Sequence, residues 1–355
     1  MTLDDAIQFA LYFIQPVANN RFLWVVATVI FAVSLVTVPL LSRDTAGYAL
    51  NADMLYHGHF NPYIEPIGLG RQASQLGSLW WLNYPSPYGP VFLLIILVPW
   101  LASAAQLLPF IFIYKLLALA AFLAAFYLFR RYRRQTNQPD YLDWLFLLNP
   151  ALIINLLLEG HNEVFIILCL LWLLVYEKRF TVILTGLLAA VFIKLTALIV
   201  WPLTWFKNQR FSWQRFIIAN LLLALAWSLF FGIIQLTPLD FWRQNFSFAN
   251  NHCFYACSPL IAATTLLPIK LAAISRFSLF VLVYLVSLYL FLFKKYQPLK
   301  FIIWSFMALF FINTKWLTPW YPAVIIPFSL LVKERKYLIL AGALTAYCLW
   351  HYVGL

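Results

Sequence analysis

Apolar runs of about membrane-spanning length recur along the chain, and they limit its fold more than any other feature. Residues 22–41 and 110–129 are two such runs, and 64% of the 355 residues are hydrophobic while only 10% are charged. About 20 apolar residues in an α-helix cross the hydrocarbon core of a bilayer. A soluble domain of this length needs a polar shell that this composition cannot supply. The sequence therefore predicts an all-α, polytopic transmembrane helical bundle.

The N-terminal segment 1–20 is predicted to be an interfacial helix on the cytoplasmic side. Asp4 and Asp5 stand where a cleavable signal peptide would carry basic residues. The apolar residues of this segment recur at helical spacing, which is typical of a helix that lies in the membrane surface.

Short clusters of basic residues between the apolar runs set the predicted orientation. The positive-inside rule places such clusters in the cytoplasm, where anionic lipid headgroups are sufficient partners for them. The net charge of +12 is therefore explained by a membrane surface rather than by a nucleic acid. The clusters are RRYRR at 130–134, EKR at 177–179, KNQRFSWQR at 207–215, KKYQPLK at 294–300 and KERK at 333–336.

With these clusters inside, the chain makes about eleven crossings, with the N-terminus inside and the C-terminus outside. The apolar stretches 90–107 and 259–275 fit this count only as lateral or re-entrant helices on the outer face. Residues 42–89 and 236–258 then form two extracytoplasmic loops of one membrane domain, 1–355. The predicted crossings are 22–41, 110–129, 141–158, 164–176, 180–193, 195–206, 214–235, 276–293, 301–314, 320–332 and 337–353.

Asp44 comes directly after the first predicted span, and its carboxylate has two interpretations. It is either a charge at a helix boundary or the working acid of an enzyme that faces away from the cytoplasm. Ionisable residues from distant segments, among them Glu159 and Lys194, fall on the same predicted face. A purely structural membrane subunit does not need this convergence, so the sequence places any chemistry on the outer face.

The polar turn GHNE at 160–163 separates two apolar runs. Such a turn can be merely solvated, yet Glu159, His161 and Glu163 supply two carboxylates and an imidazole within five residues. That set suits a divalent cation or a sugar hydroxyl. A divalent cation is the only cofactor that the sequence leaves open.

Two lysines stand at apolar segments, where a charge is costly unless it is paired, snorkelling or functional. Lys194 interrupts the run AAVFIKLTALIVWP, and Lys315 lies in TKWLTPWYP beside Trp320 and Tyr321. Either ammonium group could hold a lipid phosphate, and the aromatic rings could stack on a sugar. The alternatives are snorkelling for Lys194 and membrane anchoring by an aromatic belt for the rings.

The four cysteines do not by themselves predict a disulfide or a metal site. Cys169 and Cys348 lie in apolar runs and are predicted to be inert. Cys253 and Cys257 lie in the second predicted outer loop, where a disulfide is an open alternative. A zinc site is the weaker alternative, because His252 is the only further ligand near the pair.

Several motifs in this order resemble the GT-C superfamily of integral-membrane glycosyltransferases. The resemblance covers residues 40–325, is closest to the bacterial polyprenol-phosphate-mannose-dependent mannosyltransferases, and extends more loosely to glycosyltransferase family 87. The motifs are Asp44 after the first span, Tyr48, LYHGHFNPY at 55–63, YPSPYGP at 84–90, NPALIINLLLEGHNE at 149–163, Lys194 and PWYP at 319–322.

The resemblance implies an inverting hexosyltransferase of the bacterial cytoplasmic membrane, with its active site outside. It would move a mannose-like hexose from a polyprenyl phosphate to a lipid or glycan acceptor, and Asp44 would be the general base. The cations available to bind the donor phosphate are Lys194, Lys315, Arg243 and Arg276. The candidate substrate-binding residues are Tyr48, Asp53, Tyr63, Tyr88, Glu159, His161, Asn162, Glu163, Trp320 and Tyr321.

The chemistry is consistent with these residue types. One carboxylate can deprotonate the acceptor hydroxyl. The leaving lipid phosphate is a stable anion that needs cations rather than a second acid. The sequence shows no glycine-rich loop for a nucleotide sugar. The alternatives are a polyprenyl-linked sugar flippase or transporter, which would favour repeats and broken helices, and a glycan ligase, which would favour more arginines in its outer loops.

Overall fold

The computed structural model describes residues 21–39, 44–58, 61–70, 80–207, 210–241, 269–294, 297–314 and 317–353, and it is almost entirely helical. Up to η6, its helices are α2 (Arg21–Val36), α3 (Asp44–His57), η2 (Ile67–Leu69), η4 (Trp80–Asn83), α4 (Pro90–Ala102), α5 (Leu107–Gln135), α6 (Tyr141–Leu147), α7 (Pro150–Leu152), η5 (Ile153–Leu158), α8 (Glu163–Val175), α9 (Phe180–Ile193) and η6 (Leu195–Trp205). After it come β1 (Phe206–Lys207), β2 (Arg210–Phe211), α10 (Trp213–Ile234), α13 (Ile269–Tyr289), η7 (Leu290–Lys294), α14 (Pro298–Met307), η8 (Ala308–Asn313), α15 (Trp320–Ala323), α16 (Ile325–Leu330) and α17 (Arg335–Val353).

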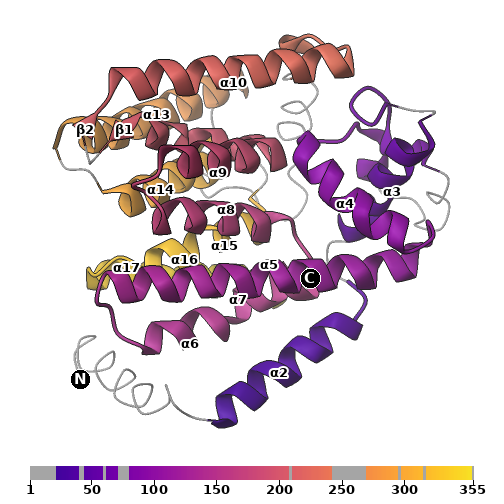
Figure 1. Cartoon of the computed structure of the whole chain (residues 1–355), viewed down its shortest axis with the longest axis horizontal. Coiled ribbons are helices and arrows are strands. Elements are labelled where there is room, and N and C mark those ends of the chain that lie inside the picture. Colours follow the sequence, from indigo (N-terminus) through magenta and orange to yellow (C-terminus); the bar gives the residue numbers. More distant parts are fainter. Residues whose placement is uncertain are drawn as a thin grey trace.

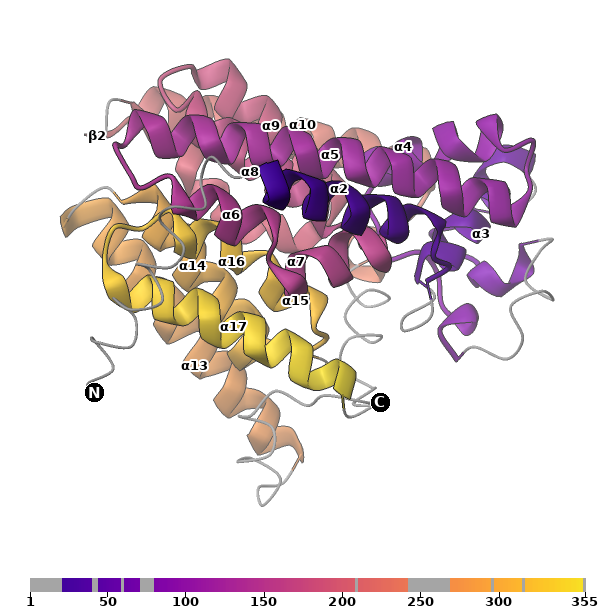
Figure 2. The same cartoon turned by 90° about the horizontal axis from the view of Figure 1, so that it is seen from below.

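The long helices form a bundle with a smaller helical cluster at one end. Helices α5, α8, α9 and α10 run side by side, while α3 and α4 gather at one end of α5 (Figure 1). The turned view shows α13, α14, α16 and α17 as a second layer beside α5, α9 and α10 (Figure 2). The α3–α4 cluster thus lies at the opposite end of α5 from α6.

Four segments of the described part are long and apolar enough to cross a membrane: Leu107–Gln135, Tyr141–Leu158, Trp213–Ile234 and Ile274–Lys294. Seven further apolar helices there have 10–17 residues. Helices α10 and α13 expose apolar side chains, such as Ile233 at 79% and Leu282 at 59%, as expected for surfaces in contact with lipid. The chain is an integral membrane protein, and the eleven crossings stay a prediction.

The predicted segments correspond closely to the observed helices, with two corrections. Residues 269–275 are not a separate lateral helix, because α13 continues without a break from Ile269 to Tyr289, and this stretch has no internal Gly or Pro. A short antiparallel hairpin with two residues in each strand, β1–β2, also overlaps the predicted basic loop 207–215. Residues 1–20 and 242–258 lie outside the described part, so the N-terminal helix and most of the second loop do too.

Local sequence signals set several helix boundaries. Asn149 ends the α6 segment and caps α7, because its side-chain oxygen accepts hydrogen bonds from Ala151 N and Leu152 N at 3.0 and 3.2 Å. Ser212 caps α10 in the same way through Arg215 N at 3.4 Å. Pro90 occupies the first turn of α4, where its missing N–H costs nothing.

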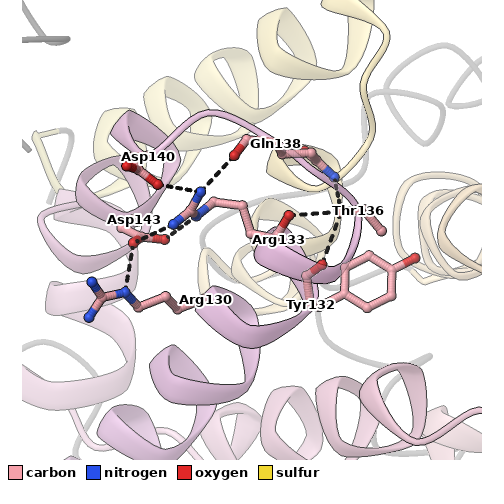
Figure 3. A network of polar contacts seen from close by, with 7 residues as sticks. All are labelled: Arg130, Tyr132, Arg133, Thr136, Gln138, Asp140 and Asp143. Atoms are coloured by element: carbon pink, nitrogen blue, oxygen red, sulfur yellow. Dashed lines mark hydrogen bonds and ion pairs between the residues drawn. The ribbon is translucent and has the colours of Figure 1, made fainter.

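Two arginines of the basic cluster at 130–134, Arg130 and Arg133, form ion pairs within the protein, while Arg134 is exposed and its lipid partners stay a prediction. Arg133, with a side chain 3% exposed, donates to Asp143 at 2.7 and 3.2 Å and to Gln138 O at 2.6 Å, and it pairs with Asp140 at 2.6 Å (Figure 3). Arg130 pairs with Asp143 at 3.2 Å, and Gln138 donates to Leu331 O at 2.6 Å. This network ties α5 to α6 and to the end of α16.

Replacing Arg133 by Met is expected to lower the free energy of unfolding by about 2 kcal/mol, because buried partners lose their donor. Asp143 still pairs with Arg130 in the variant, which limits the loss of stability. Thermal unfolding in detergent measures the effect, and Arg134→Met is the matched control because Arg134 is exposed in the same helical turn. Equal stability of the two variants would contradict a structural role for Arg133.

Candidate active site

Four segments that are distant in sequence meet at the α3–α4 end of the bundle. They are the start of α3 at Asp44, the turn 159–163 between η5 and α8, the junction of α9 and η6 at Lys194, and α15 with its two aromatic residues. Side-chain and main-chain contacts join these segments into one group, which we call the Asp44–Lys194 site.

The turn 159–163 has a defined conformation rather than that of a solvated loop. The π-helical segment η5 widens the chain, so that Glu159 N donates to Ile154 O at 2.9 Å, and π-helical turns are frequent at functional sites. Gly160 has φ +70°, and a Cβ there would lie 3.2 Å from Thr45 Oγ1. Positive φ combined with this close contact explains why glycine stands at this position.

Asp44 lies against a histidine that is held by a tryptophan. His161 Nδ1 is 3.4 Å from Asp44 Oδ2, and the imidazole stacks on the Trp320 ring with centroids 3.9 Å apart and planes at 19°. The His161 side chain is 0% exposed, whereas that of Asp44 is 18% exposed. A substrate can therefore reach the carboxylate, while the imidazole lies behind it.

Lys194 pairs with Glu163, at the other end of the turn 159–163 from Glu159. Its Nζ donates to Glu163 Oε1 at 2.5 Å and lies 4.6 Å from the centroid of the Tyr321 ring. The Lys194 side chain is 12% exposed and that of Glu163 is 1% exposed. The charges of Asp44 and Lys194 also interact, so a reachable acid and a reachable cation belong to one electrostatic environment.

Aromatic rings form the wall behind Asp44. Tyr48 makes edge-to-face contacts with Tyr88, Phe92 and Tyr114 at centroid distances of 5.2, 4.8 and 5.3 Å. Its hydroxyl accepts a hydrogen bond from Asn162 N at 3.3 Å. Burial raises the pKa values of Tyr48 and Tyr88 well above their ordinary value. Both phenols therefore stay protonated at neutral pH.

The proline-rich segment 84–90 approaches Lys194 through its glycine. Gly89 N donates to Ile193 O at 3.0 Å, and a Cβ on Gly89 would lie 2.1 Å from Phe192 O. Only glycine permits this contact between two main chains. The contact fixes the last turn of α9, from which Lys194 emerges, against the residues that open α4.

The site contains ten of the predicted residues, and three others lie elsewhere. Asp53 pairs with His57 on α3, with Oδ1 2.8 Å from Nδ1. Tyr63 packs on Phe230 of α10 at 5.1 Å. Arg276 is buried on α13, and no contact in the described part joins it to the site. Lys315, Arg243, His252, Cys253 and Cys257 lie outside the described residues.

Sequence reasoning missed two residues that hold the segment around Asp44. Lys115, 1% exposed within α5, donates from Nζ to Thr37 O at 2.5 Å. Thr45 Oγ1 donates to Glu159 O at 2.6 Å. Lys115 interrupts an apolar run just as Lys194 does, so the same signal could have identified it. Nothing in the local sequence marks Thr45.

The described residues contain no group of three or more His, Cys, Asp or Glu side chains that could hold a metal ion. Glu159, His161 and Glu163 therefore do not form a metal site with one another. Glu159 instead has a fully buried side chain, and its carbonyl is the acceptor for Thr45.

The arrangement offers one reachable carboxylate, one reachable ammonium group and an aromatic wall. A carboxylate in this position can accept a proton from a hydroxyl. An ammonium group in a partly dry environment can stabilise an anionic leaving group. Aromatic rings such as Trp320 provide apolar faces for a sugar ring. These parts fit a group transfer between a hydroxyl acceptor and a sugar donor with an anionic leaving group.

Comparison with known proteins identifies the family. The family model described as alpha-(1->6)-mannopyranosyltransferase, N-terminal domain, matches residues 8–207, more than half of the chain. The match includes Asp44, Tyr48, the turn 159–163 and Lys194. The comparisons with curated proteins and with solved structures give no match. The chain therefore belongs to the MptA/B family of alpha-(1->6)-mannopyranosyltransferases, within the GT-C superfamily, and is a glycosyltransferase.

Proposed function

We propose that the protein transfers mannose from a polyprenyl phosphate to a hydroxyl of a lipid or glycan acceptor, with inversion at the anomeric carbon. The observation that carries this proposal is the pair of reachable opposite charges, Asp44 and Lys194, on the two sides of one buried turn. The family supplies the sugar and the α-(1→6) product.

Asp44 is the general base in this proposal. Its carboxylate takes the proton of the acceptor hydroxyl as the hydroxyl oxygen bonds to the anomeric carbon of mannose. The bond from that carbon to the phosphate oxygen breaks, and the electron pair leaves with the lipid phosphate. A single displacement inverts the anomeric centre, so an α-linked product requires a β-linked donor.

Lys194 holds the leaving phosphate. Its Nζ carries three donors and, among the residues that the structure describes, makes one hydrogen bond, to Glu163, which leaves donors for phosphate oxygens. Charge on the bridging oxygen grows as the bond breaks, and a fixed cation stabilises that charge. Lys315 and Arg243 are further proposed phosphate ligands, on the basis of the sequence. The proposed substrate contacts are Tyr48, Tyr88, Asn162, Trp320 and Tyr321.

The site is proposed to face the extracytoplasmic side. Tyr114, near the start of α5, contacts Tyr48, whereas Arg133, near its end, lies in a basic cluster. The helix between these residues rises about 1.5 Å per residue, which separates them by most of a bilayer. If the basic cluster is cytoplasmic, Asp44 is outside.

A donor test in nanodiscs addresses the proposal directly. Purified protein receives a lipid acceptor extract and labelled mannose as β-linked polyprenyl phosphate, as its α-linked epimer, or as a nucleotide sugar. We expect transfer only from the β-linked lipid phosphate, with an α-linked product. Transfer from the nucleotide sugar, or a β-linked product, would contradict the donor or the inversion. A companion assay in sealed proteoliposomes separates the alternative, because donor movement across that bilayer without transfer would instead indicate a flippase.

A further inference from the structure

We infer that the turn 159–163 sets the separation between the general base and the phosphate cation. In this inference His161 is a positioning residue for Asp44, and Glu163 is a positioning residue for Lys194. The inference rests on the proposed function, because it takes Asp44 as base and Lys194 as phosphate ligand. It assigns the two turn residues a role behind the reacting groups.

The first support is the contrast in exposure within each pair. The side chains of His161 and Glu163 are 0% and 1% exposed, while their partners Asp44 and Lys194 are 18% and 12% exposed. A substrate that reaches the outer member of each pair does not reach the inner one in this conformation. The inner members are therefore placed to orient their partners rather than to bind substrate.

The second support is the fixation of the imidazole. Its ring stacks on Trp320 at 3.9 Å, and its main-chain N–H donates to Asn155 O at 3.0 Å. The ring cannot rotate away from Asp44 without losing the stacking contact. His161 thus limits the rotamers of a carboxylate that stands at the first residue of a helix.

The third support is that one short segment carries both restraints. His161 and Glu163 are two residues apart, and the N–H of Asn162 between them is held by the Tyr48 hydroxyl at 3.3 Å. Glu163 begins α8, which packs between α5 and α9. The base and the cation, 150 residues apart in sequence, therefore take their positions from the same five residues.

Matched variants at the two positions test the inference through different kinetic parameters. His161→Leu removes the nitrogen beside Asp44, whereas His161→Asn keeps a nitrogen close to Nδ1. Glu163→Leu removes the acceptor for Lys194, whereas Glu163→Gln keeps an oxygen there. Initial rates of mannose transfer are measured in nanodiscs with donor and acceptor varied separately. Thermal unfolding of each variant shows whether it is folded.

We expect His161→Leu to lower kcat about 10²-fold with the donor KM within twofold, because a base misplaced by about 1 Å loses this much. His161→Asn is expected to recover at least tenfold of that loss. Glu163→Leu is expected to raise the donor KM about tenfold with kcat within threefold, and Glu163→Gln to lie within threefold of wild type in both parameters.

Three results would overturn the inference. The first is an unchanged kcat for folded His161→Leu. The second is that each conservative variant behaves like its Leu counterpart, which would indicate packing alone. The third is tighter donor binding in Glu163→Gln, which would show that the carboxylate competes with the phosphate. If His161→Leu does not fold, His161→Phe, which keeps a ring on Trp320, replaces it with the same expected kcat.

A double variant separates this inference from the proposed function. If His161 acts through Asp44, adding His161→Leu to Asp44→Asn leaves the residual rate unchanged within twofold. A further tenfold loss in the double variant would overturn the positioning role alone. Full activity of Asp44→Asn would instead reject the proposed function.

Discussion

Replacing Asp44 by Asn is expected to lower kcat for mannose transfer by about 10³-fold while donor affinity stays within about twofold. General base catalysis contributes about 10²–10⁴-fold in enzymes. Asn has nearly the same shape as Asp but cannot accept the acceptor's proton at neutral pH. Because the two side chains have nearly the same volume, the substitution alters little packing at Asp44, the first residue of α3. The main loss should therefore lie in the chemical step.

The measurement follows labelled mannose from polyprenyl phosphate into an acceptor lipid, under single-turnover conditions with donor bound before the acceptor is added. The matched control is Asp140→Asn, the same exchange in a side chain that is 72% exposed at the other end of the bundle. The control should retain at least half of wild-type kcat. Wild-type turnover by Asp44→Asn would remove Asp44 from the mechanism, and equal losses in both variants would indicate a general effect of losing an acid.

A loss of donor binding in Asp44→Asn would point to a different role. The charge of Asp44 interacts with that of Lys194, so its removal increases the local positive charge. This change favours an anionic lipid phosphate rather than opposing it. Weaker donor binding would therefore mean that the carboxylate contacts the sugar itself, as a substrate-binding group rather than a base.

The helices were predictable from the sequence because a bilayer requires each spanning helix to be a long apolar run. Apolar length predicted α10 and α17 to within two residues at each end, and α5 to within six. The number of crossings was less predictable, because helices of 10–17 residues such as α8 and α9 satisfy the same apolar pattern without reaching the length of a full span.

The members of the site were also partly predictable, because unusual residues stand out against apolar surroundings. Asp44, His161, Glu163 and Lys194 were expected on one face, and the structure brings them together. Their pairing was not expected, since it depends on how α3, α8 and α9 pack. Asp53 was expected to bind substrate, but it pairs with His57 one turn further along the same helix, with Oδ1 2.8 Å from Nδ1.

Specific tertiary contacts, whether between main chains or between side chains, leave no signal in a hydropathy pattern. YPSPYGP at 84–90 indicated a rigid approach to a helix, but not that Gly89 meets the main chain of α9. Arg133 likewise looked like any other lipid-facing basic residue until its partners in 138–143 were in place. Both features depend on tertiary contacts that a single sequence does not reveal.

Replacing Gly89 by Ala is expected to lower the free energy of unfolding by about 3 kcal/mol, at the upper end of overpacking costs. The new Cβ would lie 2.1, 2.5 and 2.9 Å from O, C and Cα of Phe192. None of these atoms belongs to a side chain that could rotate away. The last turn of α9 must therefore move, and the Gly89 N–H bond to Ile193 O at 3.0 Å must lengthen.

The same movement should reach the site, because Lys194 directly follows Ile193. Gly89→Ala should therefore raise the donor KM as well as lower the unfolding temperature in detergent, and both are measured on the same preparation. The matched control is Gly232→Ala in α10, where a Cβ meets nothing within 4 Å. It should be neutral or more stable by up to about 1 kcal/mol, since alanine favours helix over glycine. If both alanine variants bind donor and unfold like wild type, the contact between segment 84–90 and α9 does not hold Lys194 in place.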